Sequence, residues 1–497
     1  MAWALLFLIV TSFLAFDLGA ESGRAVLGTL DGERLAVNET ARFANTPIRE
    51  GASLRWDVHA LRHEVSRALT ALGNAPIESL GVDTWGCDYG LIGSNGELLE
   101  LPYHYRDTRT DGVMARVFAR VPRERIYAIT GVQCLPFNTL YQLCAARAAT
   151  PDLVESARMM LTMPDLVNFW MTGRLACEYT NATTTQCVDV TTRRWAVDLL
   201  STLDLPTHIF GPIVEPGTRL GSLRGAVSAA YAGTPVVAPA CHDTGSAVAS
   251  VAASGHTAFL SSGTWSLLGT EVPQPIVSAR GRELNFTNEG GVGGTTRLLK
   301  NIGGLWLLQS CRRAWADEGH AYSYEELVVS AGDNRRAFRT LVDPDDPAFL
   351  HPEKMTTAIA DYCRATGQPA PDEPGDYART IFESLAFKYR VVLEWLEEVT
   401  GTPIHVIRVI GGGARNRLLN QFTADATGRV VLAGPVEATA LGNIAMQMIA
   451  TGAVATLAEA REIIERSFPS DRFEPTSVDV WAAHYARFQE YVGLTCA

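Results

Sequence analysis

Lysine is scarce in this chain, and the short motifs that mark many nucleotide and hydrolase sites are missing. The 497 residues include three lysines, Lys300, Lys354 and Lys388, and none of them follows a glycine. A Walker A loop requires Gly-Lys, so P-loop chemistry is excluded. The sequence also lacks HExxH, GxSxG and a strict GxGxxG, which removes zincins, α/β-hydrolases and the usual dinucleotide-binding turn. Any nucleotide must therefore be held in another way.

The cysteines and the overall charge exclude further classes. Nine cysteines form an odd number with no CxxC pair, unlike a disulfide framework or a zinc site. This pattern favours a reducing, cytoplasmic setting. The formal net charge of −12 argues against a general nucleic-acid-binding or anionic-membrane surface, although a locally held anionic substrate stays compatible with it.

The N-terminal run MAWALLFLIVTSFLAF is apolar but carries no positive charge, because no Lys or Arg precedes Arg24. A secretory signal normally has a positive n-region, and cleavage near Ala15 would cut the strand that delivers Asp17. The run is interrupted by Thr11 and Ser12 and stops short of the roughly 20 residues of a membrane span. We therefore expect an extended first strand.

The length and the order of elements predict two α/β domains. The chain exceeds the roughly 250–300 residues at which a single core stops growing. Strands alternate with helices in the first half, and the opening pattern recurs around residues 235–275. We expect domains 1–245 and 246–497 with a nucleotide in the cleft between them. The predicted strands cover 5–17, 24–30, 35–43, 77–83, 258–262 and 404–410, and the predicted helices cover 57–72, 376–400, 414–428 and 439–450.

Three turns after predicted strands are candidate ligand sites. In FLAFDLGAESGR, Asp17 ends a strand and the following turn leaves backbone N–H groups free to approach an anion. Asp17 could also hold a metal ion, directly or through water. The turn at Ser261–Thr264 and the three glycines at 411–413 follow strands in the same way. Each segment is also compatible with an ordinary turn that binds nothing.

The segment CHDTGSA, residues 241–247, follows a strand-like run and opens a helix. Asp243 is either a helix N-cap or a general base aimed into a cleft, with His242 and Thr244 as polar neighbours. Spacing alone favours the cap. Asp83 and Asp88 also lie near strand ends, where α/β sheets place their sites. For Trp85, Trp265, Cys87 and Cys241, ordinary burial is the favoured interpretation.

Seven segments, taken together, resemble the FGGY carbohydrate kinases, in the family's order and over nearly the whole chain. Three of them, SSGTWSL, the NEGG segment with LKNIGGLWLLQ, and GPVEATALGNI, most resemble the members that act on L-rhamnulose. The seven segments are DLGAESGR (17–24), GVDTWGCDY (81–89), the run MPDLVNFW to RRW (163–195), CHDTGSAV (241–248), LSSGTWSLLG (260–269), the run NEGG to LLQ (288–309) and the run VIGGG to LGNI (409–444).

The resemblance implies two actin-like domains of the ribonuclease-H type that use ATP and Mg2+. By position, Asp243 would be the catalytic base, which reverses the preference for a cap. Asp17 would lie near Mg2+. The implied ATP-binding residues are Ala20, Glu21, Ser22, Gly23, Arg24, Thr264, Gly411, Gly412 and Gly413. The implied sugar-binding residues are Gly86, His242, Asp243, Thr244, Asn301 and Gln309, although the last two are equally compatible with plain polar positions.

The implied reaction is phosphorylation of L-rhamnulose at its 1-hydroxyl by ATP. A sister kinase of L-fuculose or D-xylulose is the near alternative, because ketose epimers differ by a few hydroxyl contacts. A non-kinase actin-like ATPase is the distant alternative. The expected partners are a small sugar and ATP, with no nucleic acid and no membrane, and the oligomeric state stays open.

Overall fold

The computed structural model describes residues 10–333, 336–350 and 352–495. The chain divides into two compact units that are interleaved along the sequence. Unit 1 comprises Met1–Ala252, Val272–Leu298 and Ala438–Phe468, and unit 2 comprises Ala253–Glu271, Leu299–Glu437 and Pro469–Ala497. The division into domains 1–245 and 246–497 stays a prediction.

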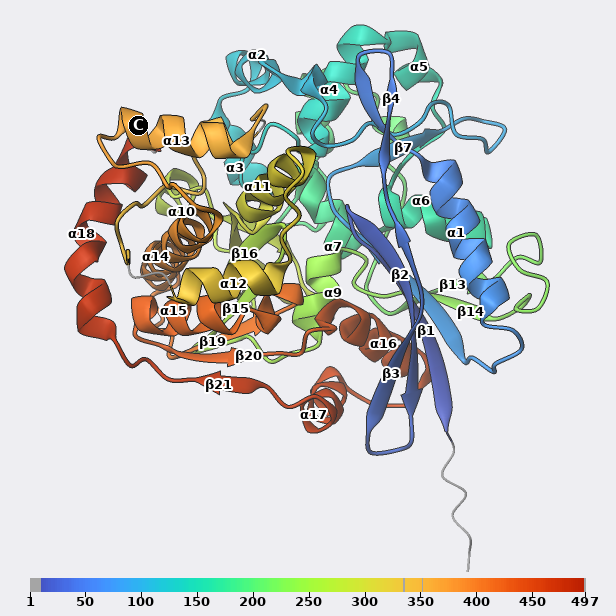
Figure 1. Ribbon diagram of the computed structural model, residues 1–497. Helices are drawn as coiled ribbons and strands as arrows, with labels where there is room; N and C mark the ends of the chain where they lie inside the picture. The colour runs from blue at the N-terminus through green and yellow to red at the C-terminus, as the bar shows by residue number, and fades with distance from the viewer. Residues whose placement is uncertain (1–9, 334–335, 351, 496–497) are drawn as a thin grey trace, which may run out of the picture. The chain divides into compact units, whose positions relative to one another are not determined.

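Unit 1 is built on a six-stranded sheet in the order β13-β14-β6-β1-β2-β3. Strands β1 (Thr11–Leu18), β2 (Ser22–Leu30) and β3 (Leu35–Ala44) pair antiparallel, and Figure 1 shows them as neighbours. β6 (Ser79–Thr84) and β14 (Pro235–Ala238) extend the sheet in parallel from β1. β13 (Thr218–Ser222) closes the edge antiparallel to β14.

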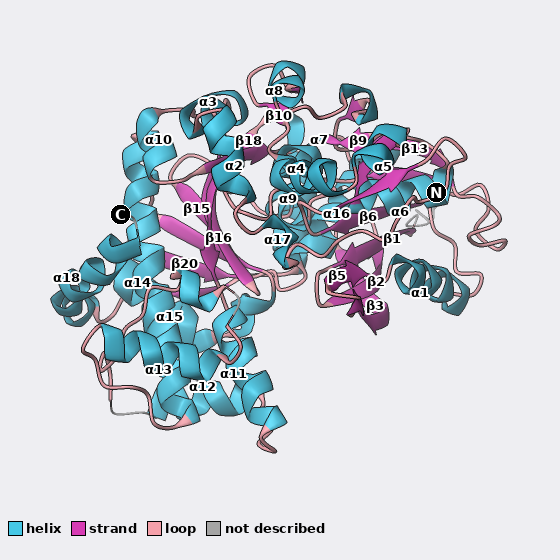
Figure 2. Cartoon of the chain, turned by 90° about the horizontal axis from the view of Figure 1, so that it is seen from above, coloured by secondary structure: helices cyan, strands magenta, loops and turns pink. Residues whose placement is uncertain are grey.

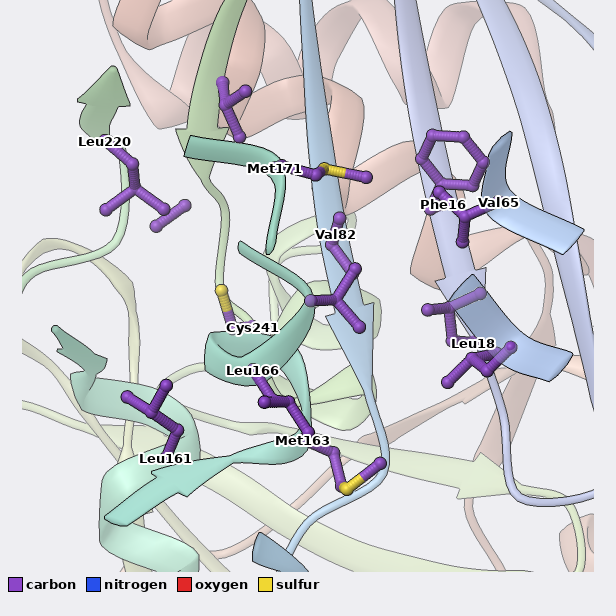
Figure 3. Packing of buried hydrophobic residues seen from close by; sticks show 14 of the residues in the cluster. Phe16, Leu18, Val65, Val82, Leu161, Met163, Leu166, Met171, Leu220 and Cys241 are labelled. Carbon is purple, nitrogen blue, oxygen red and sulfur yellow. The ribbon is translucent and has the colours of Figure 1, made fainter. Parts of the chain in front are cut away.

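The two faces of this sheet are covered by different helices, because successive side chains of a strand point to opposite faces. Leu14, Phe16 and Leu18 pack with α1 (Val58–Ala71) and α6 (Met163–Thr172). Figure 3 shows Phe16 and Leu18 beside Val65 of α1. Phe13 and Ala15 pack instead with α16 (Ala438–Thr451) and α17 (Leu457–Ser467). Asp17 shares the parity of Phe13 and Ala15, so it lies on the α16 face.

Two glycines let α16 approach its neighbours closely. A Cβ at Gly442 would overlap the Ser246 carbonyl oxygen and lie 2.6 Å from the Ser246 carbonyl carbon. A Cβ at Gly81 would lie 2.6 Å from Asn443 Oδ1. Gly442 therefore lets the backbones of α16 and α9 (Asp243–Ala249) pack at a distance that any side chain there would prevent, and Gly81 on β6 leaves room for the Asn443 side chain.

The rest of unit 1 consists of short elements, many of them around a second apolar cluster that includes Tyr141 and Leu200. These elements are β4 (Pro47–Glu50), β5 (Ser53–Trp56), β7 (Tyr89–Ile92), α2 (Val113–Arg120), α3 (Arg123–Thr130), α4 (Thr139–Ala149), α5 (Pro151–Ser156), β8 (Met159–Thr162), β9 (Cys177–Glu178), α7 (Tyr179–Ala182), β10 (Val188–Asp189), β11 (Arg194–Trp195), α8 (Val197–Thr202), β12 (Ile213–Val214), α10 (Ala279–Glu283) and β17 (Thr287–Gly290).

Five strands of the second sheet repeat the order of the first: β18-β16-β15-β19-β20 corresponds to β3-β2-β1-β6-β14, whereas β21 follows its neighbour β20 in the chain and β13 precedes β14. The seven-stranded sheet runs β17-β18-β16-β15-β19-β20-β21, and β17 with the first residues of β18 is assigned to unit 1. β15 is antiparallel to β16 and parallel to β19, β20 is parallel to β19, and β21 is antiparallel to β20 at the edge. Figure 2 shows α15 beside β20. The elements are β15 (Thr257–Ser262), β16 (Trp265–Val272), β18 (Thr296–Gly303), α11 (Trp306–Asp317), α12 (Tyr324–Asp333), α13 (Met355–Ala365), α14 (Pro374–Thr400), β19 (Val406–Ile410), α15 (Arg417–Thr427), β20 (Val430–Ala433), β21 (Asp471–Phe473) and α18 (Val478–Thr495).

The predicted order of strands and helices, and its recurrence in the second half, are confirmed. The helix predicted over 414–428 begins at Arg417, because the Asn416 side chain caps it by accepting the Leu419 N–H at 3.0 Å. The first strand begins at Thr11, and residues 5–9 of the predicted strand lie outside the described residues. None of the described helices has both the length and the apolar character needed to cross a membrane.

Candidate active site

Acidic residues stand at the carboxyl ends of three neighbouring parallel strands of unit 1. Asp17 and Asp83 occupy paired positions at the ends of β1 and β6. Thr84 pairs with His242 beyond the end of β14, and its N–H donates to the Cys241 carbonyl at 2.9 Å. Asp243 is the next residue. These strand ends are where α/β sheets usually carry their ligand sites.

Arg24 pairs with Asp17 across the first turn. Its Nε and Nη2 donate to Asp17 Oδ2 at 2.9 and 2.7 Å, and both side chains are largely buried. Asn45 holds the turn from outside: its N–H donates to the Glu21 carbonyl at 3.0 Å and its Nδ2 to the Gly19 carbonyl at 2.9 Å. Asn45 has no sequence signal that would have identified it.

Gly23 is required by packing. A Cβ at this position would overlap the Phe43 ring and lie 3.0 Å from Leu18 Cδ2. The predicted ATP-binding residues Ala20 and Ser22 are half-buried, whereas Glu21 is exposed. The turn therefore presents Glu21 outward while Gly23 is buried in the sheet.

Asp83 is fully buried and linked to α16. Asn443 Nδ2 donates to Asp83 Oδ2 at 2.6 Å, and Gln447 Nε2 donates to Asn443 Oδ1 at 2.8 Å. Burial raises the pKa of Asp83 well above its usual range, and the negative charges of Asp17 and Asp243 raise it further. Asn443 was not predicted, because it comes from a helix distant in the chain.

Asp243 is the first residue of α9, and His242 is the N-cap residue. The N-cap interpretation of Asp243 is therefore wrong by one position. Asp243 Oδ1 accepts the Thr244 N–H at 2.5 Å and the Thr244 hydroxyl at 3.2 Å, and it lies 3.4 Å from His242 Nε2. Burial raises the pKa of Asp243, His242 opposes that shift, and Asp17 adds to it.

Gly86 and Cys87 form a tight corner in front of Thr184. A Cβ at Gly86 would lie 2.9 Å from Thr184 Oγ1, so only glycine fits without movement. Cys87 has a φ of 70°, a left-handed conformation unusual for a residue with a side chain. Its N–H donates to Thr184 Oγ1 at 3.1 Å, and its carbonyl accepts the Thr139 hydroxyl at 2.5 Å.

The next acid, Asp88, is a buried anchor rather than an open site. Its Oδ2 accepts the indole N–H of Trp56 at 2.6 Å and of Trp85 at 3.0 Å, and the Tyr105 N–H at 3.1 Å. Its Oδ1 accepts Gln142 Nε2 at 2.8 Å. Burial raises the pKa of Asp88 to about 6, although these hydrogen bonds favour the ionised form.

Ordinary burial is confirmed for two of the four residues for which it was favoured. Trp85 and Cys241 are buried in the core of unit 1, whereas Trp265 and Cys87 are half-buried. The eight cysteines within the described residues are free, as the sequence predicted.

In unit 2 the second turn and the three glycines are neighbours. A Cβ at Gly413 would overlap Ser262 Oγ, and Gly411, whose φ is 81°, lies near the Ser262 carbonyl. The Gly263 and Thr264 carbonyls accept the N–H groups of Leu305 and Trp306 at 3.0 and 3.1 Å, which ties the turn to α11. A Cβ at Gly412 would meet nothing within 4 Å, so this glycine faces open space.

Asn301 and Gln309 also belong to unit 2, on β18 and α11, and both are half-buried. Gln309 Oε1 is buried and accepts no hydrogen bond from the described residues. A buried amide oxygen without a hydrogen-bond partner is unfavourable, and a ligand that donates a hydrogen bond to it would remove that cost. The structure thus places Gly86, His242, Asp243 and Thr244 in unit 1, and the two amides in unit 2.

The chemical types of the residues present suit the binding of Mg2+ and ATP. The described part of the chain holds no group of three or more His, Cys, Asp or Glu residues that could coordinate a metal. Mg2+ does not need such a group, since it usually keeps several waters and binds one or two carboxylates and the substrate phosphates. Asp17 at a strand end can be such a carboxylate. The open side of Gly412 leaves room for a flat group such as a nucleoside base.

Solved sugar kinases share this architecture. The structure matches gluconate kinase from Lactobacillus acidophilus with a TM-score of 0.80 at 16% identity, covering 98% of this chain and 99% of that one. It matches Plasmodium falciparum glycerol kinase with ADP with a TM-score of 0.77 at 15% identity, covering 98% of each chain. The fold is that of the two-domain sugar kinases.

Sequence comparison is more specific. The sequence patterns of the FGGY family of carbohydrate kinases match at residues 12–249 for its N-terminal domain and 258–451 for its C-terminal domain. A Bacteroides thetaiotaomicron protein named rhamnulokinase is 45% identical over 97% of this chain and 99% of its own length. A Pectobacterium atrosepticum protein of that name is 44% identical over 97% of this chain and 96% of its own. The chain belongs to the FGGY family of carbohydrate kinases, which confirms the predicted resemblance.

Proposed function

We propose that this enzyme transfers the γ-phosphoryl group of ATP to the 1-hydroxyl of L-rhamnulose, in L-rhamnose catabolism. The observation that carries the proposal is the similarity, at 44–45% identity over 97% of the chain, to the two relatives named rhamnulokinase. A kinase of L-fuculose or D-xylulose is the alternative, because the fold is shared by kinases of several sugars.

Asp243 is proposed as the general base that accepts the proton of the sugar hydroxyl as its oxygen attacks the γ-phosphorus. The contacts with Thr244 and His242 engage Oδ1, so we assign proton acceptance to Oδ2. The Asp243 side chain is 31% exposed, more than that of His242 at 9%, so it can reach a substrate. A raised pKa makes it a stronger proton acceptor, as a general base requires.

The remaining roles follow the family resemblance residue by residue. Mg2+ would neutralise phosphate charge when bound, and Asp17 would hold it through water. The sugar would contact Gly86, His242, Thr244, Asn301 and Gln309. We also propose that the chain divides into domains 1–245 and 246–497. The proposed location is the cytoplasm. The proposed ATP contacts are the turn Ala20, Glu21, Ser22, Gly23 and Arg24, together with Thr264, Gly411, Gly412 and Gly413.

A coupled assay of ADP release over a panel of ketoses tests the substrate. We expect L-rhamnulose to give the highest kcat/KM, with L-fuculose and D-xylulose well below it. Turnover of either alternative ketose without turnover of L-rhamnulose would overturn the assignment. Product analysis by 31P NMR then identifies the phosphorylated hydroxyl.

A further inference from the structure

A buried ion pair lies next to the Nδ1 nitrogen of His242. Arg297, at the start of β18, places its Nη2 3.2 Å from Glu289 Oε2 on β17. The same two groups reach the imidazole: Glu289 Oε2 and Arg297 Nη2 each lie 3.2 Å from His242 Nδ1. Arg297 is 1% exposed, and its Nε also donates to the Gly290 carbonyl at 2.8 Å. A carboxylate and a guanidinium therefore both contact the Nδ1 nitrogen of His242.

The other ring nitrogen of His242 faces Asp243. His242 Nε2 lies 3.4 Å from Asp243 Oδ1, so the imidazole is flanked by a carboxylate at each nitrogen. The backbone beneath it is also held, because the His242 N–H donates to Thr180 Oγ1 at 3.1 Å and the Cys241 N–H donates to Glu178 Oε2 at 3.0 Å. With the backbone fixed, the contacts at Nδ1 determine how the ring is turned.

Stability alone does not explain the buried ion pair between Glu289 and Arg297, because burying charged groups carries a desolvation penalty. Burial raises the pKa of Glu289, but the charges of Arg297 and His242 outweigh burial and leave its pKa below the usual value. Removing two charges from water is unfavourable, and apolar residues of similar size often stabilise a fold equally well. A role for the pair in orienting His242 accounts for its position better than a role in stability alone.

We propose that Glu289 and Arg297 are positioning residues, which hold the His242 ring so that its Nε2 faces Oδ1 of Asp243 and leaves Oδ2 for the sugar. The inference rests on the proposed role of Asp243 as the base. Glu289 and Arg297 touch neither substrate in this scheme and act through His242. The arrangement resembles other sites in which a buried carboxylate sets the orientation and tautomer of a histidine.

The test is Glu289→Gln, which removes the charge and keeps the shape. We expect kcat to fall about tenfold to a hundredfold, the KM for the sugar to change much less, and the Kd for ATP to stay within about twofold. The matched control is Glu383→Gln in α14, whose side chain is 1% exposed and paired with Arg379 Nε at 2.7 Å in unit 2. We expect this control to keep wild-type kcat.

A second readout does not depend on turnover. The 15N shifts of the His242 ring, assigned with a His242→Gln sample, report which nitrogens carry protons. We expect them to move in Glu289→Gln and to stay unchanged in Glu383→Gln. Wild-type shifts together with wild-type kcat in Glu289→Gln would overturn the inference, as would an equal loss of kcat in both variants.

A replacement variant and the choice of assay sugar keep the result of the test interpretable. If Glu289→Gln does not fold, Arg297→Lys replaces it, with the same expected loss of kcat, and unchanged kcat there overturns the inference. The assay uses whichever ketose the wild-type enzyme turns over. Absence of L-rhamnulose turnover thus counts against the proposed substrate, whereas an unchanged Glu289→Gln rate counts against the positioning role.

Discussion

Asp17 and Asp83 are paired side by side on the parallel strands β1 and β6, and both belong to the sheet face that α16 covers. Two neighbouring carboxylates in a buried site cannot both ionise without a large penalty. Arg24 pairs with Asp17, whereas Asp83 is fully buried and receives one amide hydrogen bond from Asn443. Burial and the neighbouring carboxylate therefore raise the pKa of Asp83 and favour its protonated form.

Asp83→Asn should reveal this proton in the pH dependence of stability. The pKa of Asp83 is raised on folding, so its stabilising contribution is present below its unfolded-state pKa of about 3.9 and is lost as pH rises toward the folded value. Asparagine is neutral at every pH and removes that loss. We expect the Tm of the variant minus that of the wild type to increase between pH 5 and pH 8.

Thermal unfolding of both proteins at half-unit pH intervals measures this difference. The other buried acids, such as Asp165 and Glu178, are common to both proteins and cancel in the comparison. A difference in Tm that stays constant between pH 5 and pH 8 would show that Asp83 is already ionised in the folded enzyme over this range.

Asp88→Asn should destabilise unit 1. The carboxylate accepts four hydrogen bonds from buried donors, and an amide can accept at one of its two atoms only. The amide NH2 would face Gln142 Nε2 or the indoles and leave a buried donor unpaired, at about 1–3 kcal/mol. We expect a Tm lower by roughly 2–4 °C for each kcal/mol. The control is the exposed Asp152→Asn, for which a shift of similar size would contradict the explanation.

Gly442→Ala should disrupt the packing of α16 on α9. Alanine normally stabilises a helix over glycine by about 0.5–1 kcal/mol, but here the added methyl would overlap the Ser246 backbone. Overpacking of this kind costs about 1–3 kcal/mol or more. Gly332→Ala in α12 is the matched control, since its Cβ would meet one side-chain atom at 3.9 Å. We expect calorimetry to show a lower Tm for Gly442→Ala and an equal or higher Tm for Gly332→Ala.

The strand ends could be predicted from sequence because the evidence for them is local. Apolar runs that stop at Asp17, Asp83 and Gly411 identify the sheet edges, and the recurrence of the opening pattern identifies the second unit. What surrounds these residues could not be read in this way. Asn443 comes from a helix 360 positions away from Asp83, and nothing in a linear pattern brings them together.

The charged residues behind His242 were missed for a related reason. Glu289 and Arg297 lie on the short strand β17 and at the start of β18, where charged residues ordinarily face solvent. Their burial and their pairing both depend on how distant parts of the chain pack together, which a linear pattern does not show. The same holds for Gly23, which carries a family motif but is required here by the Phe43 ring.

Asp243→Asn tests the chemistry itself. We expect phosphoryl transfer to fall by about 10²-fold or more, since the amide cannot accept the hydroxyl proton, while ATP binding is kept. The asparagine Oδ1 can still accept the Thr244 N–H that Asp243 accepts at 2.5 Å, so the start of α9 should be preserved. Stopped-flow kinetics give the transfer rate, calorimetric titration gives the Kd for ATP, and Tm reports folding. Near-normal turnover in a folded variant would remove Asp243 from the role of base and leave it as a residue that supports the first turn of α9.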